Sequence, residues 1–319
     1  GTVTSEPQEI EIVFEEGTNS TGEITCTDNI QGEDGDGTSE VCKLNNQICT
    51  DNLCNGSYYT HPAFTFGSEE LTGFWVGKFE LTGTIDNITT KPSEVSLRNQ
   101  RVGDFSTNIM SMNDSGNIYG FTNNADTHLI KNSEWGSVAY LSHSKYGTCD
   151  NGECREIGLN SYEGYVTGCG PVATGSIITG TTCNSYNTEL GILASTTGNI
   201  YGVYDMSGGA YDATMANIVS PDGVTMMSGR STTDNSGYTG ITYNNGSYTN
   251  FTGINYPEEK YYDKYSFNVN RESRIRGKLG DSTKETFEGN DYGWYDDDSL
   301  LGNAGYPWFV KGGYYGLTL

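Results

Sequence analysis

Acidic side chains near the C-terminus form the densest group of possible metal ligands in this sequence. They lie in the segment 288–301, EGNDYGWYDDDSLL, and a smaller acidic segment, GEDGDG, occupies residues 32–37. Ca²⁺ binds several carboxylate and carbonyl oxygens at once, although neither segment has the residue order of an EF-hand loop. We therefore expect either a calcium site or an ordinary solvated acidic loop in the first segment. The candidate calcium ligands are Asp291, Asp296, Asp297 and Asp298.

Aromatic residues beside these carboxylates are the candidate ligand contacts. Flat rings next to Asp and Asn are typical of surfaces that bind carbohydrate or protein. The candidate binding residues are Trp294, Tyr295, Tyr314 and Tyr315. Trp308 lies in the same part of the sequence, but we expect it to pack in the core.

Cysteines are the second group of reactive side chains. The eight of them are Cys26, Cys42, Cys49, Cys54, Cys149, Cys154, Cys169 and Cys183. A structural zinc site would need CxxC-type pairs or cysteines mixed with histidines, and the sequence has neither, so disulfides are favoured over thiol ligands or free thiols. We expect Cys149–Cys154 and Cys169–Cys183 as local pairs, whereas the four N-terminal cysteines allow three connectivities. Disulfides indicate an oxidising, extracellular location.

The histidines do not indicate a catalytic or metal site. They are His61, His128 and His143. His128 and His143 flank a predicted helix and would lie roughly 22 Å apart along it at about 1.5 Å per residue, too far to share a metal. Surface or helix-capping roles are expected for all three. The glycines of 168–173 match GxGxxA, but no helix is predicted to follow, so a dinucleotide site is not expected.

Composition and charge limit the possible partners. The formal net charge is −24, which disfavours nucleic acid and anionic membranes, since phosphate binding needs clustered Lys and Arg. No apolar run approaches the roughly 20 residues that span a bilayer. The 43 glycines and 23 tyrosines favour strands and loops over helices.

The elements expected to position these residues are mostly short. Alternating apolar residues predict strands at 9–16, 74–81 and 200–206, and the closing sequence 306–319 predicts a strand followed by a Gly-Gly turn. Residues 17–57 are predicted to form an acidic, disulfide-linked insertion.

Helices are expected within 92–112 and 128–147. In the second, Asn132 or Ser133 would cap the N-terminus, with Glu134 in the first turn. The buried face is predicted to contain Trp135, Val138, Ala139 and Ser142. We expect an α+β fold in which residues 1–319 form one domain.

Three sequence segments resemble a known enzyme family. GNIYGVYDMSGGAY (198–211) is similar to the YGLYDM-GN-WEW signature of formylglycine-generating enzymes, KNSEWGSVAYLS (131–142) to their EAEWEYAA helix, and WFVKGG (308–313) to their RVLRGG turn. The resemblance implies an elaborated C-type-lectin-like fold, in which Tyr204, Met206 and Tyr211 fill the core. Tyr211 stands where the family usually has Trp, and Lys311 where it usually has Arg.

The formylglycine-generating activity itself is not expected. It requires a reactive, copper-binding cysteine pair downstream of the YDM signature, and the last cysteine here is Cys183. The chain also ends six residues after Gly313, where the family continues, so we expect a C-terminal truncation or strands supplied by another chain.

The segments HPAFTFG (61–67), GFWVGKFE (73–80) and ASTTGNIYGVYDMSGGA (194–210) carry a closer resemblance. It spans residues 8–313 and is to pilin-like surface proteins of gut Firmicutes. It implies a non-catalytic extracellular module for recognition or adhesion that binds carbohydrate or protein. The alternatives are a structural subunit of a pilus-like filament, formed by self-association, and, least favoured, a formylglycine-generating-type enzyme.

Overall fold

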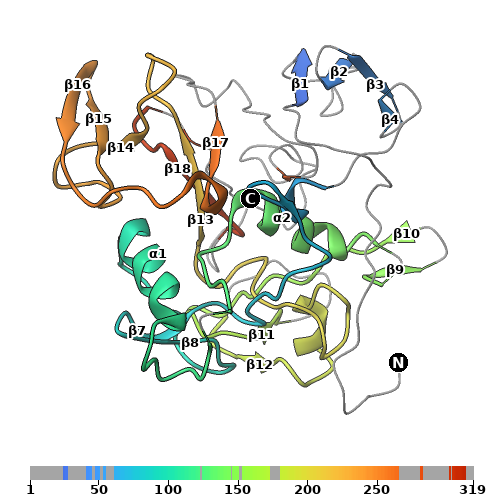
Figure 1. Cartoon of the computed structure of the whole chain (residues 1–319). Coiled ribbons are helices and arrows are strands. Elements are labelled where there is room, and N and C mark those ends of the chain that lie inside the picture. The colour runs from blue at the N-terminus through green and yellow to red at the C-terminus, as the bar shows by residue number, and fades with distance from the viewer. Residues whose placement is uncertain are drawn as a thin grey trace.

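The computed structural model describes most of the chain after residue 60. The described residues are 61–122, 124–144, 146–150, 153–172, 180–265, 281–282, 302 and 304–313, together with the backbone of four strands between residues 24 and 54. The α-helices among them are α1 (Val102–Met110) and α2 (Asn132–Leu141), and the 3-10 helices are η2 (Pro62–Phe64), η3 (Ser111–Asn113), η4 (Gly191–Ala194) and η5 (Glu259–Tyr261). With its many small sheets, the fold is α+β, as predicted (Figure 1).

A three-stranded mixed sheet lies at the centre of the molecule, in the order β17-β13-β18. Its strands are β13 (Asp212–Ile218), β17 (Asp263–Tyr265) and β18 (Trp308–Lys311). β13 pairs in parallel with β17 and antiparallel with β18, with a register shift between Ala213 and Asn217. The last five residues of β13 are all buried, which is expected of a strand that is covered on both faces.

Two apolar clusters cover the opposite faces of β13. Because side chains alternate along a strand, Met215 packs into a cluster with Phe105 and Trp308, whereas Ala216 and Ile218 pack into another. The second cluster also contains Met227, Tyr265 and Phe309. A third cluster joins Trp135 of α2 to Met206. Several large aromatic side chains are buried in this core, among them Trp135, Tyr238 and Tyr265.

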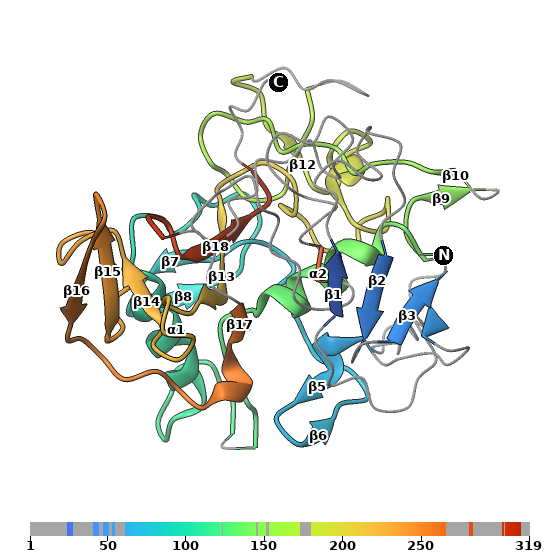
Figure 2. The same cartoon turned by 90° about the horizontal axis from the view of Figure 1, so that it is seen from above.

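The other strands after residue 60 form two-stranded antiparallel sheets and one further three-stranded sheet, β14-β15-β16. The bounds are β5 (Thr65–Phe66), β6 (Glu69–Glu70), β7 (Thr82–Thr84), β8 (Asn87–Thr89), β9 (Cys149–Asp150), β10 (Glu153–Cys154), β11 (Cys169–Gly170), β12 (Asn184–Ser185), β14 (Met227–Gly229), β15 (Gly240–Asn244) and β16 (Ser247–Phe251). Seen from above, they surround the central sheet and α2 (Figure 2).

The predicted insertion at 17–57 contains a four-stranded antiparallel sheet. Its strands are β1 (Ile24–Thr27), β2 (Val41–Leu44), β3 (Gln47–Thr50) and β4 (Leu53–Cys54). In the backbone register Cys42 lies opposite both Cys26 and Cys49, and Cys49 lies opposite Cys54. The segment has regular structure that its polar sequence did not predict, because the strands are too short to show a period.

The cysteines later in the chain agree with a disulfide-bonded protein. The predicted Cys169–Cys183 disulfide is present. Cys149 is disulfide-bonded, and the β9–β10 hairpin places Cys154 directly opposite it. Among the described residues there is no free cysteine.

Both predicted helices are present, but the cap of α2 differs from the prediction. The N-cap residue is Lys131, not Asn132 or Ser133. Instead, the carboxylate of Asp263, on the distant strand β17, accepts a hydrogen bond of 2.7 Å from the Ser133 N–H. Trp135, Val138, Ala139 and Ser142 are all buried, as predicted.

Two predicted strands are absent. Residues 74–81 make no strand ladder. Residues 200–206 do not either, because Asp205 has a φ of 63°, which a regular strand does not allow. The two segments instead lie side by side, and the Tyr204 N–H donates to the Lys78 carbonyl at 2.9 Å.

The prediction for Tyr211 was also wrong. Tyr204 and Met206 are buried, as expected, but Tyr211 is 39% exposed. Gly208 and Gly209 both have positive φ and lie just before Ala210 and Tyr211 in the sequence. The turn at these glycines directs Tyr211 away from the core. The predicted strand at 9–16 lies outside the described residues.

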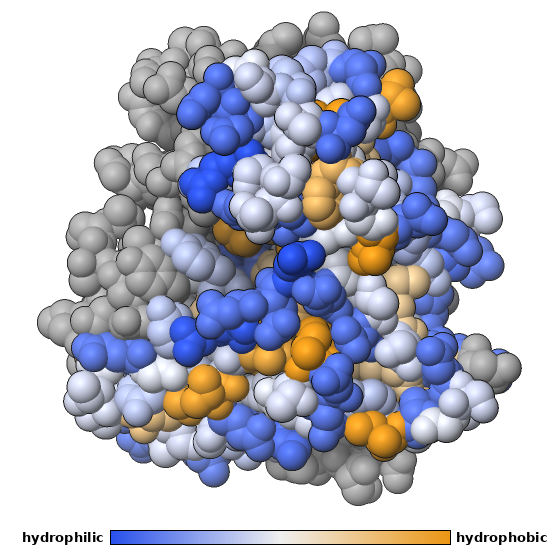
Figure 3. Space-filling model, turned by 90° about the vertical axis from the view of Figure 1, so that its left-hand side faces the viewer, coloured by the Kyte–Doolittle hydropathy of each residue, from blue (hydrophilic) through white to orange (hydrophobic). Residues whose placement is uncertain are grey.

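The described residues on one side of the molecule form a mainly hydrophilic surface. Figure 3 shows small apolar groups separated by hydrophilic residues on the side of the molecule that carries α1 and β16. None of the helices in the described part of the chain is long and apolar enough to cross a membrane.

Candidate functional site

The central strand β13 anchors two distant loops that meet at the surface. The Met215 N–H donates to the Ile130 carbonyl at 2.8 Å and so fixes the segment before α2. One residue further, Ala216 pairs with Asp263 of β17, which fixes the segment of η5 just before it. Residues near 126 and near 260 are therefore brought together by a single strand.

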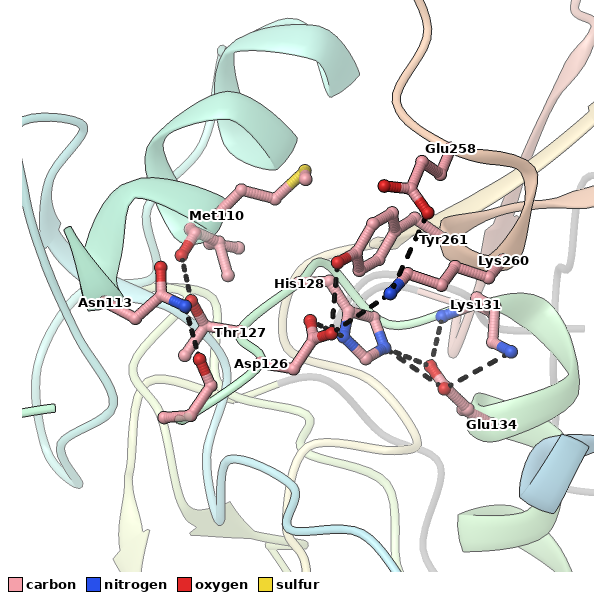
Figure 4. Close-up of polar contacts among 12 residues, drawn as sticks. Met110, Asn113, Asp126, Thr127, His128, Lys131, Glu134, Glu258, Lys260 and Tyr261 are labelled. Carbon is pink, nitrogen blue, oxygen red and sulfur yellow. Dashed lines mark hydrogen bonds and ion pairs between the residues drawn. The ribbon is translucent and has the colours of Figure 1, made fainter. Parts of the chain in front are cut away.

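Asp126 is the residue on which the two loops converge (Figure 4). Its Oδ2 accepts a hydrogen bond from the Tyr261 hydroxyl at 3.0 Å and lies 3.6 Å from the Lys260 ammonium. Its Oδ1 lies 3.8 Å from His128 Nδ1. The side chain is 43% exposed, so Tyr261 and Lys260 orient a carboxylate that solvent still reaches.

The titration of Tyr261 and Lys260 reflects this arrangement. Burial and the hydrogen bond to Asp126 raise the pKa of Tyr261. Partial burial alone would lower the pKa of Lys260, but Tyr261, Asp126 and Glu258 raise it overall. At neutral pH the phenol is therefore a proton donor and the ammonium is charged.

Behind Asp126 a buried ion pair supports His128. His128 Nε2 lies 3.1 Å from both carboxylate oxygens of Glu134, whose side chain is only 2% exposed. The same carboxylate accepts a 2.8 Å hydrogen bond from the Lys131 N–H and lies 3.6 Å from the Lys131 ammonium. Because the carboxylate is an acceptor, Nε2 of His128 carries its proton.

The Phe66 ring joins these two layers. It stacks on His128 at 5.2 Å, meets the edge of Tyr261 at 5.3 Å, and lies 5.2 Å from the Lys131 ammonium and 4.9 Å from that of Lys260. Cation–π contacts with partly desolvated ammonium groups are favourable. The β5–β6 hairpin is thereby fixed against both loops.

Two shallow hollows open on either side of Asp126, with volumes of about 340 and 360 Å³. The first is lined by Phe66, Gly67, Ser68, Glu69, Asp126, Glu258, Glu259 and Lys260. The second is lined by Met110, Asn113, Asn124, Ala125, Asp126, Thr127 and Tyr261. Both volumes fall at the lower end of the range for small-ligand sites.

The linings show which groups a ligand would meet. Carboxylates accept hydrogen bonds, whereas the amides of Asn113 and Asn124 both donate and accept. The first hollow has four acidic residues against one lysine, and such a surface repels anions. The site therefore favours a small polar ligand that is neutral or carries an amine.

A separate carboxylate network lies beneath the YDM segment. Asp205 accepts hydrogen bonds from the Gly168 N–H at 2.8 Å and from the Asn160 amide at 2.9 Å. Glu80 accepts from the Ala210 N–H at 2.9 Å and from the Ser96 hydroxyl. Burial raises the pKa of Asp205 to about 6, and burial together with the charges of Asp205 and Asp212 raises that of Glu80. These groups join buried loops, so their role is structural.

None of the residues around Asp126 was among the site residues predicted from the sequence. Trp294, Tyr295, Tyr314 and Tyr315, with Asp291, Asp296, Asp297 and Asp298, lie outside the described residues, and the predictions for them stay predictions. Within the described ranges, no cluster of three or more His, Cys, Asp or Glu side chains is arranged to hold a metal.

The histidine predictions can be compared with the structure. His61 caps η2, where its Nδ1 accepts from the Ala63 N–H at 3.1 Å, and His143 lies 3.3 Å from Glu156. His128 differs, since its Nε2 lies 3.1 Å from the carboxylate of the buried Glu134. Its neighbours Asp126 and Glu134 in DTHLIKNSE were the sequence signal that could have indicated this site.

Comparison with known proteins gives no family assignment. No protein-family model matches the chain, and no curated protein is similar to it.

Proposed function

We propose that this chain is a non-catalytic, extracellular recognition module of a surface-displayed protein, built on a C-type-lectin-like fold, which binds carbohydrate beside Asp126. The observation that carries the proposal is that one solvent-accessible carboxylate, oriented by Tyr261 and Lys260, borders two hollows at once. Groups that are ordered before a ligand arrives bind it at a lower entropic cost.

The chemistry of the hollows supports a saccharide over a protein ligand. Sugar hydroxyls can both donate to carboxylates and pair with amides, and the Tyr261 ring offers apolar surface to the C–H groups of a sugar. The hollows are small and separate, whereas a protein partner needs a broad contact surface. The Cys169–Cys183 disulfide supports the extracellular location.

A glycan array tests the proposal. The wild-type chain is expected to retain neutral or amine-bearing glycans and not sialylated or sulfated ones, because the first hollow is acidic. Asp126→Asn should lose this binding. Asp86→Asn, which makes the same charge change at the exposed β7–β8 turn, should keep it. Equal binding by both variants, or selective retention of anionic glycans, would refute the assignment.

A further inference from the structure

The hairpin β15–β16 carries a strand that is left exposed by the residues that the structure describes. Ser247, Tyr248, Thr249 and Asn250 are exposed and Phe251 is partly exposed, so neither face of β16 is packed. Figures 1 and 2 both show β16 as the outermost strand of the sheet β14-β15-β16. The outer backbone edge of β16 is therefore accessible, as well as its side chains.

The geometry of the turn identifies the unpaired backbone groups. Asn245 and Gly246 have φ values of 48° and 86°, as in a two-residue type I′ turn, so the flanking pair exchanges two hydrogen bonds. Ser247, Thr249 and Phe251 then bond to β15. Tyr248 and Asn250 alternate with them and direct their N–H and C=O groups away from β15. Neither makes a backbone hydrogen bond to another segment of the described chain.

The edge also lacks the usual protection against pairing. Natural edge strands commonly carry a charge, a proline or a bulge that blocks a second strand. There is no Asp, Glu, Lys or Arg between Asp234 and Glu258, and β16 reads SYTNF. Two copies of a chain with net charge −24 repel each other over most of their surface, and this repulsion is weakest where both copies are uncharged.

We propose that β16 is a homodimerisation edge, where it pairs antiparallel with β16 of a second copy across a two-fold axis. An axis at Thr249 places Tyr248 of each copy opposite Asn250 of the other, so that the outward backbone groups bond reciprocally. Such an isologous contact is closed, because it uses the same surface on both copies. The dimer would present two Asp126 sites and bind multivalent surfaces more tightly. The pairing does not depend on the carbohydrate assignment.

Two variants of one residue test the pairing. Asn250→Pro removes an outward N–H without removing a bond to β15, and Asn250→Ala keeps that N–H while removing the same side chain. By sedimentation equilibrium, the wild type and Asn250→Ala should approach twice the chain mass of 34.7 kDa with rising concentration. Asn250→Pro should stay at the single-chain mass. A wild type that stays monomeric, or an Asn250→Pro chain that dimerises equally, would overturn the proposal.

Amide hydrogen exchange provides a test that needs no variant. The exposed amides of Tyr248 and Asn250 should exchange at least about tenfold more slowly at high protein concentration than at low, because pairing protects them. The amide of Asn87 on β8, outside the proposed contact, serves as the internal control and should not change. Exchange of Tyr248 and Asn250 that is independent of concentration would contradict the pairing.

Discussion

Glu80 and Asp205 bring two buried carboxyl groups close together, and the Glu80 N–H lies 3.5 Å from Asp205 Oδ2. Asp205 is buried and Glu80 is partly buried, and each has a raised pKa, that of Asp205 about 6. The folded protein therefore binds protons at these groups more tightly than the unfolded chain does. This part of the stability is complete below the unfolded pKa values of about 4 and is lost as the pH rises through about 6.

Glu80→Gln should make the protein less sensitive to pH. An amide keeps an acceptor for the Ala210 N–H and removes a buried charge. We expect the variant to be more stable than wild type at pH 8, where Glu80 carries a charge above its raised pKa, with little difference at pH 4, where Glu80 is protonated. Thermal unfolding at both pH values measures this. Glu94→Gln, at a surface ion pair with Lys91, is the control, and a parallel shift in both variants would contradict the account.

Glu134→Ala should destabilise the protein strongly. The substitution leaves His128 and both nitrogens of the buried Lys131 without their carboxylate. Removing one partner of a buried ion pair costs about 3–5 kcal/mol, and urea unfolding would measure the loss. Glu189→Ala, on the exposed surface, should change stability by less than about 0.5 kcal/mol. If Glu134→Ala lost no more stability than Glu189→Ala, the Lys131–Glu134 ion pair would add nothing to the stability of the fold.

The stability of the protein should depend on the size of the side chain at Trp308, on β18, more than on its polarity. Its ring stacks with Tyr238 at 5.6 Å and Tyr256 at 6.1 Å, while its buried indole N–H has no hydrogen-bond partner among the described residues. We expect Trp308→Ala to cost about 3–5 kcal/mol. Trp308→Phe keeps an aromatic ring and loses no polar contact, so it should cost less than half as much. Equal losses by denaturant titration would contradict this packing.

The sequence predicted the elements whose signals are local. Helix α2 follows from the spacing of Trp135, Val138 and Ala139, and the turn after β18 follows from Gly312 and Gly313, which both have positive φ. The stretch 200–206 alternates like a strand, but hydrogen bonds from Gly168 and Asn160 to Asp205 hold that residue at positive φ. These bonds come from distant segments, so the alternation gave the wrong prediction.

The candidate site could not be predicted for the same reason. Asp126 and Tyr261 are 135 residues apart in sequence and meet only because β13 fixes the segments on which both lie. Tyr261 lies in η5, within the sequence PEEKYYDKY (257–265). Nothing within that stretch indicates a partner near residue 126.

The affinity of Asp126 variants for a retained glycan is the most direct test of the central claim. Isothermal titration with the glycan held most strongly on the array should give a Kd at least about tenfold weaker for Asp126→Asn than for wild type, a loss of about 1.4 kcal/mol. Asp86→Asn should match wild type. An unchanged Kd for Asp126→Asn would show that the ligand does not bind between these two hollows.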